Sequence, residues 1–263
     1  MPVMKVGPGR ALLYSGIVAW DPSQPTTDGG LLPEHWYRSD GPLWQDAGVT
    51  PAVLDGDVIG RWEDLTANAD HVNQAVAGNK PTLQNAAGDL LNGHPVVRGD
   101  SLNDYVRGTF TTGGAIAQPF TVFGVTKRNS WVANDFTSRT FIDDSAGVLC
   151  LMYARNNDDP DKWAIHYGAL QQGNATNGNW NIWTVLANGA TGQLWHNGIS
   201  QVVGNVGANA MAGITVFNNF AGAQAWDGDA TEILVYSANP SNADKNQIGQ
   251  YLGTRYGLAY TDI

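Results

Sequence analysis

The amino-acid sequence predicts an all-β protein, an antiparallel β-sandwich of the jelly-roll type with one amphipathic helix near its C-terminus. Two features of the composition point to this class. Of the acidic residues, 21 are Asp and 3 are Glu, and 32 of the 263 residues are Gly. Asp and Gly favour turns, whereas Glu and Lys fill exposed helix faces. A third feature is a series of short β-branched and aromatic runs between turn residues.

The expected strands follow one another without the helical crossovers that a parallel sheet needs. The run 120–126 alternates as a half-buried strand does. Asn197-Gly198 is a strong hairpin signal between two of the runs. The expected strands cover residues 35–38, 58–62, 96–98, 104–107, 120–127, 139–143, 148–154, 162–167, 180–187, 193–197, 214–217 and 230–236.

The expected helix covers residues 242–256. Ser241 follows a proline and is a favourable N-cap residue, and Gly257 is a favourable residue just after the C-terminus. Ile248, Leu252 and further apolar residues recur at helical spacing, which predicts an amphipathic helix that lies on the sandwich.

We expect one sandwich domain over residues 31–263, preceded by an arm or linker over residues 1–30. The stretch 24–30 consists of turn-forming residues. The first residues lack the long apolar segment of a secretory signal peptide, so we expect no export by that route. The arm is a candidate for docking on a neighbouring protein.

Composition argues against several classes of partner and site. The net charge is −10 and no cluster of Lys or Arg occurs, which argues against a nucleic-acid partner. No apolar run reaches the roughly 18 residues of a membrane span, so we expect no membrane insertion. Cys150 is the single cysteine and excludes an internal disulfide. It lies in an apolar run, 148–152, which predicts a buried, inert thiol.

Four blocks of the sequence carry a common pattern. They are Trp62-Glu63-Asp64 within 58–71, Asn92-Gly93-His94-Pro95-Val96-Val97-Arg98, the run 226–236, and Tyr251-Leu252-Gly253-Thr254-Arg255-Tyr256-Gly257-Leu258. In this order they resemble the laminin-G-like modules of the concanavalin A-like lectin/glucanase family. The sequence departs from that pattern at Gly99, where the family has Phe, and at Thr66-Ala67-Asn68, where it has Ser-Gly-Asn. Residues 129–209 match no part of it.

The resemblance implies a concanavalin A-like sandwich and a non-catalytic module that recognises glycans or protein surfaces. Such modules usually act outside cells, whereas this sequence shows no signal peptide. A phage virion protein satisfies both conditions, because it is assembled in the host cytoplasm and released by lysis. We therefore expect a homo-oligomeric virion accessory, a capsid decoration or tail adhesin, with virion proteins or cell-surface glycans as partners. The alternatives are an extracellular protein and a pure capsid cement protein without sugar affinity.

Glycan recognition needs aromatic rings for stacking and polar side chains for hydrogen bonds. The stretch 153–195 concentrates such groups. From it we select Arg155, Trp163 and Trp180 as candidate ligand-binding residues. In alternating strands about half of these side chains should point into the core.

A glycan hydrolase of the laminarinase-like type is the competing enzymatic hypothesis. Its candidate catalytic residues are Asp227, Asp229 and Glu232, because glycoside hydrolysis uses paired carboxyl groups. On a regular strand Glu232 would face away from the two Asp residues. We therefore prefer a non-enzyme in which these acids shape a turn and satisfy scaffold hydrogen bonds.

No cofactor is predicted with certainty, and Ca²⁺ is the candidate. Calcium takes carboxylate and carbonyl oxygens from loops. Two loop clusters offer such oxygens, and the candidate ligands are Asp143, Asp144, Asp158 and Asp159. Solvated acidic loops are the default interpretation of both clusters, and calcium binding is the alternative.

Overall fold

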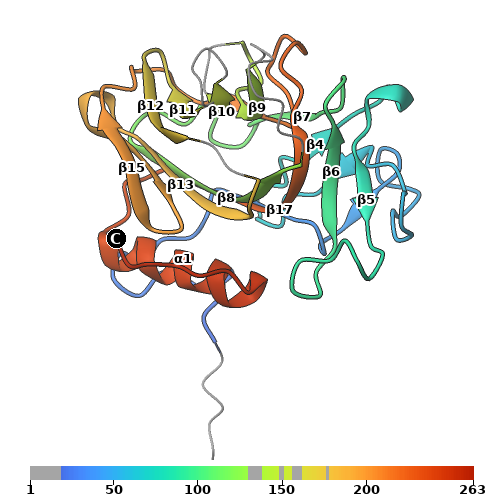
Figure 1. Ribbon diagram of the computed structural model, residues 1–263, viewed down its shortest axis with the longest axis horizontal. Coiled ribbons are helices and arrows are strands. Elements are labelled where there is room, and N and C mark those ends of the chain that lie inside the picture. The colour runs from blue at the N-terminus through green and yellow to red at the C-terminus, as the bar shows by residue number, and fades with distance from the viewer. Residues whose placement is uncertain (1–18, 130–137, 148–150, 156–161, 176–177) are drawn as a thin grey trace, which may run out of the picture.

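The computed structural model describes residues 19–129, 138–147, 151–155, 162–175 and 178–263. Within these residues the chain forms two antiparallel sheets and one C-terminal helix, which confirms the predicted β-sandwich (Figure 1). Cys150, Asp158 and Asp159 lie outside the described residues. No helix of the described residues is long and apolar enough to cross a membrane.

The first sheet, here called the helix-side sheet, has the strand order β15-β14-β13-β8-β17-β6-β5, and β1 also pairs with β17. Its strands are β1 (His35–Arg38), β5 (Thr82–Gln84), β6 (Val96–Asp100), β8 (Phe120–Arg128), β13 (Asn181–Ala187), β14 (Gly192–His196), β15 (Ile199–Gly204) and β17 (Asp227–Tyr236).

The second sheet, here called the open sheet, has the order β12-β11-β10-β9-β16-β7-β4-β3-β2. Its strands are β2 (Leu43–Trp44), β3 (Arg61–Trp62), β4 (Val72–Asn73), β7 (Val106–Thr109), β9 (Arg139–Asp143), β10 (Leu151–Arg155), β11 (Lys162–His166), β12 (Leu170–Ala175) and β16 (Gly213–Val216). Two short 3-10 turns, η1 (Ala77–Asn79) and η2 (Gly189–Thr191), lie in the connections.

The helix α1 (Asn242–Tyr256) has the predicted bounds. The Ser241 hydroxyl accepts a hydrogen bond from the Asp244 amide, and Gly257 adopts the left-handed conformation at φ 66°. Ile248 and Leu252 pack on the outer face of the helix-side sheet (Figure 1). Local capping signals therefore set both ends of the helix, and its apolar residues set the face that is buried.

Strand β8 is buried on both faces, which differs from the half-buried strand that its alternation predicts. Phe120 and Val122 point into the core between the sheets, whereas Phe123 and Val125 point toward α1. Thr121, on the helix-side face, is also fully buried. The helix covers what would otherwise be the solvent face of this strand.

The described part of the N-terminal segment, residues 19–34, lies on α1 and is here called the strap. The Asp244 carboxylate accepts hydrogen bonds from the amides of Asp28 and Gly29, at 3.0 and 2.9 Å. The ring of Trp20 packs edge-on against Tyr251, with centroids 5.9 Å apart. Residues 19–30, predicted as part of an arm or linker, therefore pack against the sandwich domain.

Three of the four sequence blocks that carry the family pattern contact one another directly, and the remaining block contributes to the core. Arg98 forms a two-point ion pair with Asp229, with Nε–Oδ1 2.6 Å and Nη2–Oδ2 3.0 Å. The Asn92 side-chain amide donates to the Arg255 carbonyl at 2.8 Å. Trp62 is fully buried in the core between the sheets. The pattern thus corresponds to scaffold contacts that join distant strands and the helix.

Candidate functional site

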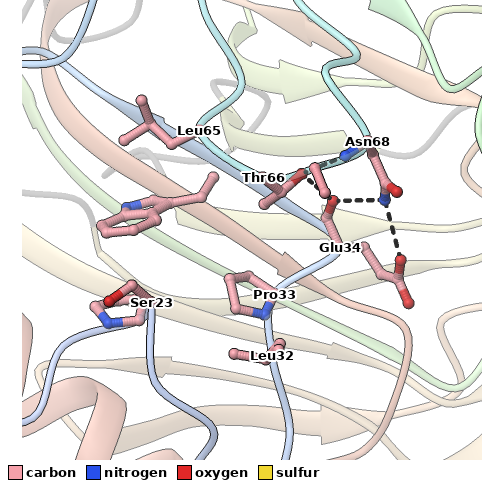
Figure 2. Close-up of a pocket in the computed structure, with 10 residues that line it drawn as sticks. Ser23, Leu32, Pro33, Glu34, Leu65, Thr66 and Asn68 are labelled. Carbon is pink, nitrogen blue, oxygen red and sulfur yellow. Dashed lines mark hydrogen bonds between the residues drawn. The ribbon is translucent and has the colours of Figure 1, made fainter.

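A cavity of about 360 Å³ lies between the strap and the turn Leu65–Asn68, on the helix-facing side of β1. In Figure 2, Leu65, Thr66 and Asn68 lie on one side of the cavity and Ser23, Leu32 and Pro33 on the other. We call it the Glu34 cavity. Its lining residues are Pro22, Ser23, Leu32, Pro33, Glu34, Trp36, Leu65, Thr66, Ala67 and Asn68.

The turn that forms one wall of this cavity is held in place by the buried side chain of Asp64, the residue directly before it. Asp64 Oδ1 accepts hydrogen bonds from the amides of Trp36 and Thr66, both at 3.0 Å, and Oδ2 lies 2.9 Å from His35 Nδ1. Burial by itself raises the pKa of the Asp64 carboxyl, but these hydrogen bonds hold it below its usual value. A charged carboxylate thus anchors the turn rigidly to β1.

The polar edge of the cavity is built around Glu34. The Asn68 side-chain amide donates to the Glu34 carbonyl at 2.9 Å and to its carboxylate Oε2 at 3.2 Å (Figure 2). Thr66 Oγ1 donates to the same carbonyl at 2.9 Å. The Ser237 hydroxyl donates to the other carboxylate oxygen, Oε1. A carboxylate offers about four acceptor positions, so acceptor capacity remains for hydroxyl groups of a ligand.

A second cavity of about 310 Å³ adjoins the first, and Glu34 lines both. We call it the Ser237 cavity. Gly113 and Gly114 line it with positive φ angles of 79° and 72°, so this loop depends on glycine. Its lining residues are Glu34, His35, Thr112, Gly113, Gly114, Ala115, Ile116, Ala117 and Ser237.

The two cavities differ in character. The Glu34 cavity has apolar walls with polar groups along one edge. The walls include Trp36 and the exposed side chain of Leu32. The Ser237 cavity has hydroxyl-bearing and glycine residues. Concave sites with apolar walls and a few placed polar groups are typical of small-ligand binding sites. The pair provides two places for ring-sized, hydroxyl-bearing groups that share Glu34 as a lining residue.

The acids predicted for a hydrolase lie on β17, where a bulge between Ala230 and Glu232 changes the expected alternation. Ala230 and Ile233 both point into the core, and Glu232 points toward α1. Asp229 contacts Arg98, which alternates with the core residue Val97 and so also lies on the outer face. The expectation that Glu232 faces away from Asp229 is therefore wrong, because the bulge inserts one residue between them.

Glu232 is fully buried and its oxygens are held by the protein. Its carboxylate accepts hydrogen bonds from Trp36 Nε1 at 2.6 Å and from the hydroxyls of Tyr256 and Tyr251 at 2.7 and 3.1 Å. Burial raises the pKa of Glu232 to about 7, against the lowering effect of these hydrogen bonds and of Arg255. With no exposed surface, the carboxyl joins β17 to α1 and offers no oxygen to a substrate.

The remaining two acids of β17 also differ in surroundings. Asp229 is 2 % exposed and its two oxygens face the Arg98 guanidinium. Asp227 is partly exposed at the start of the strand and pairs with Asp100 in the ladder. A hydrolase needs two accessible carboxyl groups that flank a bond. The described contacts give Asp229 and Glu232 structural partners instead.

Two of the three predicted ligand-binding residues lie on opposite faces of the helix-side sheet. Trp163 is 1 % exposed and packs between the sheets against Trp183, at a centroid distance of 4.8 Å. Trp180 packs on the other face of the helix-side sheet, beside α1. Arg155 is the last residue of β10, and its side chain lies outside the described part of the structure. The burial of Trp163 leaves no ring face for a sugar, which corrects that part of the prediction.

The predicted calcium ligands Asp143 and Asp144 are buried and bind backbone amides. Asp144 accepts from the amides of Ala212 and Ala146, at 2.6 and 2.7 Å. Asp143 Oδ2 accepts from the Phe220 amide at 2.8 Å. Among the described residues, no group of three or more His, Cys, Asp or Glu is arranged to hold a metal ion. These two side chains act as clamps between loops.

Sequence reasoning did not identify the residues of the two cavities. Glu34, Asn68 and Ser237 are far apart in sequence. The pairing of β1 with the end of β17 brings Ser237 to Glu34, and the turn that Asp64 binds to β1 brings Asn68 to it. One signal was present, because Thr66-Ala67-Asn68 departs from the family pattern. Loops that vary on a constant scaffold are common locations for binding sites.

Searches of family models and of curated proteins gave no match. Among solved structures, the chain is similar to a Trypanosoma rangeli sialidase in complex with the inhibitor DANA, with 10 % identity and a TM-score of 0.54 over 86 % of this chain and 33 % of that one. It is similar to the binding domain of botulinum neurotoxin DC in complex with rat synaptotagmin II, with 13 % identity and a TM-score of 0.51 over 82 % of this chain and 51 % of that one.

A third similar structure is the botulinum neurotoxin serotype D ligand-binding domain in complex with N-acetylneuraminic acid, with 13 % identity and a TM-score of 0.50 over 81 % of this chain and 52 % of that one. The chain spans about a third of the sialidase and about half of each toxin domain. These similarities show a lectin-like β-sandwich fold, which agrees with the concanavalin A-like fold that the four blocks imply.

Proposed function

We propose that this protein is a non-catalytic glycan-binding module whose ligand occupies the Glu34 cavity and extends into the Ser237 cavity. The observation that carries the proposal is the position of the Glu34 carboxylate. Glu34 lines both cavities, and its two carboxylate oxygens accept from Asn68 of one lining and Ser237 of the other, which leaves acceptor capacity for ligand hydroxyls. The apolar wall formed by Leu32, Pro33 and Trp36 suits the C–H face of a pyranose ring.

The similar structures support this class of ligand. One is the domain solved with N-acetylneuraminic acid. A fourth similar structure belongs to botulinum neurotoxin type C, whose cell entry depends on two ganglioside molecules. Sugar binding therefore occurs on sandwiches of this shape, although the likeness of fold by itself places no ligand on this chain.

The experiment is a glycan array followed by titration of the strongest ligand against three proteins: wild type, Asn68→Ala and the matched control Asn188→Ala. Asn188 is also a surface asparagine whose amide donates within its own turn, and it lines neither cavity. Asn68→Ala removes the group that orients Glu34, so we expect affinity at least about tenfold weaker, a loss of roughly 1.4 kcal/mol. The control should bind as wild type does. Equal affinity in all three proteins would remove this site from the proposal.

We propose binding without hydrolysis because the acids of β17 have structural partners, with Glu232 fully buried and Asp229 paired with Arg98. An assay on β-glucans tests this directly. The proposal expects no release of reducing ends by wild type. Release that disappears in Glu232→Gln, with the fold retained, would support the hydrolase instead.

As a finer proposal, we retain the virion setting, with the module acting as a capsid decoration or tail adhesin. It carries forward the expectation that a module resembling the laminin-G-like family meets its glycan or protein ligand outside the cell. The genes that flank its own gene test it. Virion structural genes on either side are expected, and a neighbourhood of secretion or metabolic genes would count against it.

A further inference from the structure

The two cavities have an unusual balance of charge. Among the described residues that line them, Glu34 is the one fixed charge, and neither Lys nor Arg occurs. His35 lines the Ser237 cavity, but its Nδ1 lies 2.9 Å from Asp64 Oδ2, so its partner is an anion already present. A negatively charged ligand would find no unpaired cation in this lining.

Further carboxylates hold the segments that form the walls. Asp21 accepts hydrogen bonds from the amide and hydroxyl of Ser23, at 2.8 and 2.5 Å. Asp70 accepts from the amide of Thr112 at 3.3 Å, at the edge of the Ser237 cavity. With Asp64, which accepts from the Thr66 amide, three acids besides Glu34 therefore make direct contacts to lining residues.

Among the described residues, one arginine contacts the lining, and it is paired with a carboxylate. The Arg38 guanidinium lies over the ring of Trp36, 5.2 Å from its centroid, and its Nε is 2.6 Å from Asp40 Oδ1. The neighbouring Arg255 also pairs with Asp40. Arg38 and Arg255 thus share one carboxylate. The four acids at the linings outnumber these two arginines, so the region around the Glu34 cavity keeps its negative character.

We infer that this site selects uncharged glycans and excludes sialylated ones through the Glu34 carboxylate. The inference rests on the proposed function and specifies its ligand class. A sialic acid carboxylate placed in either cavity would approach Glu34 without a compensating cation, and like charges at close range in a partly dry cavity repel strongly. Neutral sugar hydroxyls instead donate to the same oxygens in charge-assisted hydrogen bonds.

This selectivity differs from that of the similar domain solved with N-acetylneuraminic acid. Specificity arises from repulsion as well as attraction, and a carboxylate at the centre of a site is a direct way to reject an anionic relative of a neutral ligand. The common fold supplies the scaffold, and the charges on its loops decide which sugar is accepted.

The test uses a printed array of oligosaccharide cores, each present in a neutral and a sialylated form. We expect wild type to bind neutral cores and to bind their sialylated forms at least about tenfold more weakly. Two further arms identify charge as the cause. Added NaCl screens the repulsion, so the ratio of the affinities for neutral and sialylated cores should decrease for wild type. Glu34→Gln removes the charge but keeps a side chain of nearly the same shape, and it should decrease this affinity ratio further.

The outcomes separate the two proposals. If wild type prefers sialylated cores, selection by charge is overturned. The same holds if neither salt nor Glu34→Gln changes the ratio of the affinities for neutral and sialylated cores. Either result still leaves glycan binding in place. Absence of binding to every core, neutral or sialylated, would overturn the proposed function itself. The salt arm needs no variant, so it stays informative even if Glu34→Gln folds poorly, and a thermal melt reports on that folding.

Discussion

The Glu232 carboxylate on β17 accepts a hydrogen bond of 2.7 Å from the Tyr256 hydroxyl on α1, at a position with no exposure to solvent. The same carboxylate accepts from Trp36 Nε1 of β1 at 2.6 Å, and Arg255 Nε lies 3.6 Å from it. One acidic side chain therefore fixes the helix to two strands, and its ionisation should affect the stability of the whole fold.

Glu232 should make the protein less stable as pH rises. Burial raises its pKa in the folded state from 4.5 to about 7, so between these values the folded protein keeps a proton that the unfolded chain releases. The unfolding free energy should therefore fall as pH increases across this window, by at most about 1.4 kcal/mol per pH unit. Glu232→Gln cannot titrate and should lack this fall. Urea titrations of both proteins from pH 4 to 8 measure the unfolding free energy. If it changes with pH in the same way in wild type and Glu232→Gln, this prediction is wrong.

His196 should have the opposite effect in an overlapping range. It is buried against Trp163 and Trp183, and burial lowers its pKa from 6.5 to about 3. Since the unfolded chain takes up a proton below pH 6.5 and the folded protein does not, stability should fall as pH decreases from 6.5 toward 3. His196→Phe keeps an aromatic ring and should lose less stability on acidification. A wild-type melting temperature that falls no faster than that of the variant would refute this.

Loss of the Arg98 side-chain charge should destabilise the fold more than loss of the charge of its partner Asp229. Asp229 is 3 % exposed in its side chain, whereas Arg98 is 33 % exposed and also bonds Asp89 and Gln84. Arg98→Met leaves a buried carboxylate without its cation and should cost about 3 kcal/mol, whereas Asp229→Asn leaves an arginine with other partners and should cost about 1 kcal/mol. Urea unfolding of both variants and of the double variant gives the coupling. A larger loss for Asp229→Asn would reverse the interpretation.

Asp144 should stabilise the fold without calcium. Its two oxygens accept hydrogen bonds from the amides of Ala212 and Ala146, and hydrogen bonds to a charged group contribute roughly 1.5–3 kcal/mol each. Asp144→Ala should therefore lower the melting temperature by the same amount in CaCl₂ and in EGTA. A calcium-dependent rise in the melting temperature of wild type that Asp144→Ala abolishes would instead make Asp144 a ligand.

Features with local signals were predictable from the sequence. The helix begins and ends as predicted because Ser241 and Gly257 satisfy its ends, and Asn197-Gly198 forms the β14–β15 turn with φ angles of 50° and 80°. Strands without such signals were less well predicted. The expected strand 58–62 is reduced to β3, and β12 and β15 were not predicted because their Gln, Gly and Ser residues give weak strand signals.

Features that depend on long-range contacts were not predictable. The choice between core and surface for Trp163 depends on which face of β11 meets the other sheet, and apolar residues on both faces do not reveal it. The bulge beside Glu232 appears only when β17 is paired with β8. The Glu34–Asn68 contact joins residues 34 positions apart through a turn that departs from the family pattern. The scaffold was therefore accessible from the sequence, and the cavities required the fold.

A glycan should bind beside Glu34, the residue that lines both cavities. Two-dimensional ¹H–¹⁵N NMR spectra of the full chain, titrated with the neutral oligosaccharide that binds best on the array, locate the ligand directly. We expect saturable shifts at the amides of Thr66, Asn68, Gly113 and Ser237, with little change along β12 and β15. Shifts confined to the open sheet, with the amides around Glu34 unmoved, would contradict this expectation.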